Sequence, residues 1–73
     1  MTTVYVQPAC VQCEATKRFL DKNDVEYTTV DITQDIDALE MVKGMGFTSA
    51  PVIITDNDSW SGFNPDKLKL LAA

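Results

Sequence analysis

The chain has 73 residues, of which 45% are hydrophobic, and this is enough for one small domain (residues 1–73) with a packed core. Eleven acidic and six basic residues give a formal net charge of −5. This charge argues against nucleic acid and anionic membranes as partners, since both are bound through basic surfaces. No stretch approaches the roughly 18 apolar residues of a membrane span, and no basic signal segment opens the chain, so we expect a cytoplasmic protein.

The first predicted elements are a strand and a helix. Thr3–Gln7 is rich in β-branched and aromatic residues and predicts a buried strand, which Pro8 ends because proline cannot donate to a sheet. From Val11 to about Asn23, apolar residues recur at helical spacing. The predicted core face of this helix consists of Val11, Ala15, Phe19 and Leu20. Cys10 therefore lies where the strand passes into the helix.

The next two elements complete a β-α-β unit and add a second helix. Glu26–Ile32 contains Tyr, Thr, Val and Ile and predicts a strand. Thr33 or Asp35 can cap the helix that follows, and Gly44 and Gly46 end it. The predicted core face of this helix consists of Ile36, Leu39, Val42 and Met45. The first strand, helix and second strand together predict a right-handed parallel crossover.

The last third of the chain predicts a hairpin and a final helix. Val52–Thr55 and Ser59–Ser61 are the two strands, with a turn at Asp56–Asp58. Asn64 caps the final helix. The predicted core face of this helix consists of Leu68 and Leu71. The order β-α-β-α-β-β-α predicts a small α/β domain of thioredoxin-like architecture, with three helices and a mixed four-stranded sheet.

Cys10 and Cys13 are the only cysteines, and the chain contains no histidine. As a structural disulfide they would close a short ring, worth only about 2 kcal/mol by the chain-entropy estimate. Zinc sites use four Cys or His ligands, so one chain cannot form such a site and only ligation shared between two chains is left. The spacing favours dithiol–disulfide exchange, in which one thiolate attacks a disulfide and the second thiol resolves the mixed disulfide.

The position of Cys10 at a helix N-terminus makes it the better candidate for the attacking thiol. A free thiol has a pKa of about 8.5 and is mostly protonated at neutral pH. The free N–H groups and the dipole of a helix N-terminus favour an anion, so we expect the pKa of Cys10 to lie below this value. Cys13 lies within the first turn and should be the more buried, less acidic, resolving thiol. The alternative is two thiols of similar acidity. This chemistry needs no cofactor or metal beyond the pair itself.

Two turns supply further candidate residues. Ala50–Pro51 precedes the third predicted strand, and only about 5 to 6% of X–Pro bonds in folded proteins are cis, so the sequence alone favours a trans bond. For Trp60 we expect partial exposure beside the cysteines, where an aromatic side chain can anchor a protein partner. Phe63 can either belong to the same surface or pack as a hydrophobic staple before the last helix.

Three motifs together resemble the NrdH-redoxin family over nearly the whole chain. They are Cys10-Val11-Gln12-Cys13, Ala50-Pro51-Val52, and Trp60-Ser61-Gly62-Phe63 followed by Pro65-Asp66. The resemblance implies a thioredoxin/glutaredoxin fold, with Cys10 as nucleophile, Cys13 as resolving thiol and Pro51 as a cis proline. It also implies reduction by thioredoxin reductase and electron donation to class Ib ribonucleotide reductase, with the large subunit of that enzyme as partner.

Two positions depart from this family. Asn64 stands where members of the Trp-Ser-Gly-Phe-Arg-Pro type carry Arg, and Gln7 stands where many carry a basic residue, so a positive charge is missing at each. We therefore expect weaker stabilisation of the Cys10 thiolate and a role for Asn64 through its cap. The glutaredoxin pattern for glutathione, a Gly-Gly-x-x-Asp stretch after the last strand, is absent.

Several other functions are compatible with the sequence. They are a glutathione-dependent glutaredoxin, a general protein disulfide reductase, an iron–sulfur or zinc carrier, and a non-catalytic binding module. Glutathione-linked turnover, metal bound after purification, and loss of disulfide reduction in a double cysteine variant separate them. We expect the protein to be a monomer.

Overall fold

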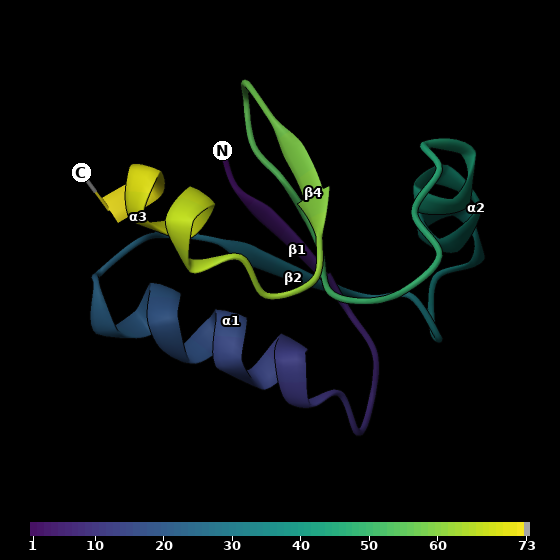
Figure 1. The fold of residues 1–73 in the computed structure, drawn as a ribbon. Helices are drawn as coiled ribbons and strands as arrows, with labels where there is room; N and C mark the ends of the chain where they lie inside the picture. Colours follow the sequence, from purple (N-terminus) through teal and green to yellow (C-terminus); the bar gives the residue numbers. More distant parts are fainter. Residues whose placement is uncertain (73) are drawn as a thin grey trace.

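The computed structural model describes residues 1–72 and places within them three helices and four strands in the predicted order (Figure 1). The elements are β1 (Thr3–Val6), α1 (Val11–Lys22), β2 (Thr28–Asp31), α2 (Ile36–Gly44), β3 (Val52–Ile54), β4 (Ser59–Ser61) and α3 (Pro65–Ala72). The first three strands are shorter than the sequence patterns suggest. Within this range, each helix is too short or too polar to cross a membrane.

The strands form one mixed sheet in the order β2-β1-β3-β4. β1 and β2 are parallel, with Thr3 opposite Thr28, which confirms the predicted parallel pairing across α1. β3 is antiparallel to both β1 and β4, so β3 and β4 form the predicted hairpin. In Figure 1, α1 and α3 lie together on one side of the sheet and α2 lies apart from them. The predicted α/β architecture is confirmed.

A row of three side chains crosses the sheet and forms the centre of the core. Val4 is the register partner of Ile53, and Ile53 is the partner of Trp60, so all three side chains share one face. Leu20 of α1 and Leu68 of α3 complete this buried cluster. The main core therefore lies between the sheet and the layer formed by α1 and α3.

Trp60 belongs to this core, with 7% of its surface exposed, so the expectation of partial exposure is wrong. Trp60 is buried because it lies opposite the buried Ile53, and register partners point to the same face of a sheet. β4 has only three residues, and so short a strand offers too little alternation to reveal its register in advance.

Three residues predicted on helix core faces are exposed instead. Val11 is 84% exposed and Ile36 is 72% exposed. Each is the first residue of its helix, where the side chain points back past the helix N-terminus and away from the turns that pack on the sheet. Met45, the C-cap of α2, is 44% exposed. The residues that are buried are Cys13, Thr16 and Leu20 in α1 and Ala38 and Val42 in α2.

Polar side chains cap α2 and α3. Asp35 Oδ1 accepts a hydrogen bond from the backbone N–H of Ala38 at 3.0 Å, so Asp35 is the cap of α2. Asn64 Oδ1 accepts from the backbone N–H of Lys67 at 3.1 Å, as predicted. These bonds satisfy N–H groups that have no partner within the helix. The Asn64 cap starts α3 directly after the loop that carries the candidate residue Phe63.

Candidate active site

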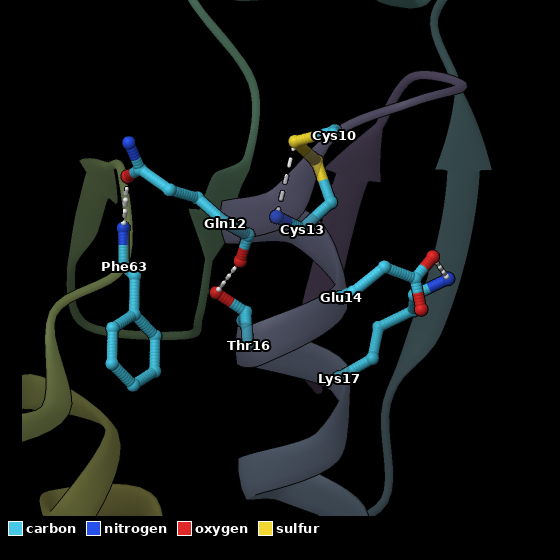
Figure 2. Close-up of a disulfide and its surroundings, with 7 residues drawn as sticks. All are labelled: Cys10, Gln12, Cys13, Glu14, Thr16, Lys17 and Phe63. Carbon is cyan, nitrogen blue, oxygen red and sulfur yellow. Dashed lines mark hydrogen bonds and ion pairs between the residues drawn. A yellow bond between two sulfur atoms is a disulfide. The ribbon is translucent and has the colours of Figure 1, made fainter.

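The two cysteines lie at the start of α1 and form a disulfide (Figure 2). Cys10 is the N-cap residue and Cys13 lies in the first turn, with their Cα atoms 5.2 Å apart. Cys13 is only 1% exposed, whereas Cys10 is partly exposed, which confirms the predicted difference in burial. The structure therefore shows the oxidised state, in which Cys10 is the cysteine that a partner can reach.

The N-terminus of α1 is directed at Cys10. The backbone N–H of Cys13 donates a hydrogen bond to Cys10 Sγ at 3.0 Å. The disulfide sulfur stands in for the thiolate that would occupy this position in the reduced protein. There the N–H group and the helix dipole both favour a negative charge. The assignment of Cys10 as the attacking thiol stays a prediction, and this geometry supports it.

The charged pair beside the cysteines, Glu14 and Lys17, offers no net positive charge to stabilise a Cys10 thiolate. Glu14 follows Cys13 directly, and its carboxylate is paired with Lys17 Nζ at 3.0 Å. The pairing offsets the repulsion between Glu14 and a thiolate at the same helix end. Gln7 stands at the position where the family resemblance predicts a basic residue, and it is exposed and uncharged. These observations support the prediction that the backbone of α1 stabilises a Cys10 thiolate.

The Ala50–Pro51 peptide bond is cis, as the family resemblance implied and against the base-rate expectation of a trans bond. Pro51 is fully buried and Ala50 is partly exposed. The carbonyl of Pro51 accepts a hydrogen bond from the backbone N–H of Gly62 at 2.8 Å. This bond joins the residue before β3 to the loop between β4 and α3.

Gln12 connects the cysteine motif to the same loop. Its Oε1 accepts a hydrogen bond from the backbone N–H of Phe63 at 2.9 Å, as Figure 2 shows. Phe63 is 39% exposed, so the structure favours its surface role over packing in the core. Sequence analysis missed Gln12, because a contact across 51 positions leaves no local pattern. Its place between the two cysteines was the only available signal.

Lys67 and Asp58 are two further residues that the sequence did not reveal. Lys67 Nζ lies 5.4 Å from the centroid of the Trp60 ring and 2.6 Å from Asp58 Oδ2. The hydrogen bond from Lys67 lowers the pKa of the Asp58 carboxyl group below its usual value. Lys67 of α3 thus places a positive charge against the β3–β4 hairpin. Asn64 acts as the cap at the start of the same helix. Trp60 Nε1 has no hydrogen-bond partner within the described part of the chain.

A large hollow on the surface lies away from the disulfide. It has a volume of about 1020 Å³ and runs between α1 and the start of β2, with Lys17, Arg18 and Glu26 among its lining residues. Neither cysteine lines this hollow. Cys10 is instead partly exposed at a helix end, where a disulfide presented by another protein can reach it.

Comparison with known proteins agrees with this geometry. The glutaredoxin family model matches residues 2–60. The glutaredoxin-like protein NrdH of Escherichia coli is 36% identical over 69 residues, covering 94% of this chain and 85% of that protein. The glutaredoxin-like protein NrdH of Lactococcus lactis subsp. cremoris is 38% identical over 72 residues, covering 99% of this chain and 100% of that protein.

A solved structure extends the similarity to three dimensions. NrdH-redoxin from Escherichia coli, described as a glutaredoxin-like protein with a thioredoxin-like activity profile, superimposes with a TM-score of 0.94 at 36% identity. The match covers 96% of this chain and 92% of that one. The predicted thioredoxin/glutaredoxin fold is thereby confirmed.

Proposed function

Because this chain belongs to the NrdH-redoxins of the glutaredoxin family and is a thiol–disulfide oxidoreductase, we propose that it carries electrons from thioredoxin reductase to class Ib ribonucleotide reductase. The observation that carries the proposal is the contrast between Cys10, which is partly exposed, and Cys13, which is 1% exposed. This contrast supports a mechanism in which the accessible sulfur attacks a disulfide on another protein and the buried sulfur acts only within the molecule.

The proposed reaction proceeds in two exchanges. The Cys10 thiolate attacks one sulfur of a disulfide in the C-terminal tail of the reductase large subunit, forming a mixed disulfide and releasing one tail thiolate. The Cys13 thiolate then attacks Cys10 Sγ, which closes the Cys10–Cys13 disulfide and releases the second tail thiolate. The tail disulfide gains two electrons and the protein loses two. Thioredoxin reductase returns two electrons from NADPH and restores the dithiol.

The tail is proposed to bind as an extended strand beside the Ala50–Pro51 turn, with Phe63 as an apolar contact. Ala50 and Phe63 are both accessible, whereas Pro51 is buried and shapes the turn. Trp60 supports this surface from within the core and does not contact the partner.

We propose that the Cys10–Cys13 pair is the only redox group, and that the protein acts as a monomer in the cytoplasm.

A glutathione-dependent glutaredoxin is the main competing function. The absence of a Gly-Gly-x-x-Asp stretch after β4, where the chain reads Gly62-Phe63-Asn64-Pro65, favours the thioredoxin reductase route. The formal net charge of −5 also disfavours an anionic tripeptide as the reductant.

The test is a reconstituted system of NADPH, thioredoxin reductase, this protein and a class Ib ribonucleotide reductase, in which deoxyribonucleotide formation is measured. We expect turnover that depends on this protein and is lost in Cys10→Ser. A parallel reaction replaces thioredoxin reductase with glutathione and glutathione reductase. Efficient turnover in the glutathione reaction and none in the first would overturn the proposal and make the protein a glutaredoxin by activity.

A further inference from the structure

The side chain of Gln12 reaches from the first turn of α1 to the loop between β4 and α3 (Figure 2). Its Oε1 accepts the hydrogen bond from Phe63 N–H at 2.9 Å. The backbone of Gln12 is itself held, because the hydroxyl of the buried Thr16 donates to the Gln12 carbonyl at 2.9 Å. A fixed helical turn between the two cysteines thus presents the acceptor to the loop.

The loop is shaped to receive this acceptor. Gly62 has a φ of +83°, which favours glycine, and a Cβ atom there would lie 3.2 Å from Gln12 Oε1. The N–H of Gly62 donates to the Pro51 carbonyl at 2.8 Å. Two successive N–H groups of the loop are therefore bound by two separate elements, one before β3 and one beside the disulfide.

We propose that Gln12 is a positioning residue for protein substrates, whose amide oxygen holds the Gly62–Phe63 loop so that the exposed Phe63 ring meets the protein that carries the disulfide. The inference deepens the proposed function and rests on it only in requiring a protein disulfide as substrate. A small disulfide needs access to Cys10 alone. The loop, and therefore Gln12, should affect protein substrates selectively.

The required property of this side chain is an acceptor at the correct distance. Glutamate offers a carboxylate oxygen at the same distance, whereas methionine has a similar length and only a weak sulfur acceptor. Gln12 and Phe63 are both exposed, so the freed N–H group can bind water and the fold should stay intact. The expected loss is in docking geometry.

The test measures second-order rate constants of the dithiothreitol-reduced protein with insulin, a protein disulfide, and with hydroxyethyl disulfide, a small one. Gln12→Met should lower the ratio of the insulin rate constant to the hydroxyethyl disulfide rate constant about fivefold, equivalent to about 1 kcal/mol at 1.36 kcal/mol per tenfold change. Gln12→Glu should restore the ratio of the two rate constants. The matched control is Gln34→Met, the same exchange at an exposed turn residue outside the site.

The added charge in Gln12→Glu acts on the Cys10 thiolate and therefore changes the rate constants for both substrates alike. The pH dependence of the hydroxyethyl disulfide reaction measures this effect on the thiolate separately from any effect on the docking of a protein substrate. In a Phe63→Ala background, Gln12→Met should have no further effect on the insulin reaction. An unchanged ratio in Gln12→Met, an equal loss with both substrates, or an unrestored ratio in Gln12→Glu would each overturn the proposal. Failure of the reconstituted ribonucleotide reductase system would refute the proposed partners and leave this inference standing.

Discussion

Replacing Trp60 by alanine should remove a large part of the free energy of unfolding. Trp60 is 7% exposed and lies in the buried row with Val4 and Ile53, covered by Leu20 and Leu68. Removal of a buried aromatic side chain costs about 3–5 kcal/mol. At about 0.05–0.15 kcal/mol per residue, a domain of 73 residues has a total stability of about 4–11 kcal/mol. The substitution therefore removes between about a quarter and all of the unfolding free energy.

Urea denaturation followed by far-ultraviolet circular dichroism measures this loss. The wild-type protein offers a second probe, since Trp60 is its only tryptophan and its fluorescence should shift to longer wavelength on unfolding. The matched variant is Phe63→Ala, which removes an aromatic side chain that is 39% exposed. It should lower the free energy of unfolding by less than about 1 kcal/mol. It should also raise the KM of the partner reductase for this protein. A loss below about 1 kcal/mol in Trp60→Ala, at an unchanged denaturant slope, would refute the placement of Trp60 in the core.

Three further changes test the site and the fold. Cys13→Ser should trap a mixed disulfide through Cys10, visible by mass spectrometry, and trapping in Cys10→Ser instead would reverse the assignment. Asp35→Ala removes the α2 cap and should cost about 1 kcal/mol in urea denaturation, so an unchanged midpoint would contradict that cap. Burial and the hydrogen bond to Asp21 raise the pKa of Tyr27 from 10.0 to about 12. The stability that Tyr27 contributes below pH 10 should be lost between about pH 10 and 12, and Tyr27→Phe should lack this loss. An absorbance titration of wild type minus that of Tyr27→Phe that places the ionisation of Tyr27 near pH 10 would refute the shift.

Features with a local signal could be predicted from the sequence. Asn64 followed by proline predicts a capped helix start, because both residues satisfy the geometry of a helix N-terminus without outside help. The pair Cys10 and Cys13 predicts redox chemistry because its short spacing disfavours a structural disulfide and the absence of histidine disfavours a metal site. The parallel pairing of β1 with β2 and the β3–β4 hairpin followed from the order of element types along the chain.

Features that depend on packing between distant segments could not be predicted. The hydrogen bond from Phe63 to Gln12 and the contact of Lys67 with the Trp60 ring exist only after the hairpin and the helices have docked. Helix periodicity placed Val11 in the core, since periodicity gives the angle of a side chain around the axis and not where the sheet ends along it.

Trp60 and Phe63 are only three positions apart, yet one lies in the core and the other on the surface. Gly62, with its positive φ, turns the chain between them. Selection can therefore change the side chain at position 63 to suit another partner without disturbing the packing at position 60. The same separation offers an engineering route, because a library of substitutions at position 63 should alter which proteins are recognised while the unfolding temperature stays near that of the wild type.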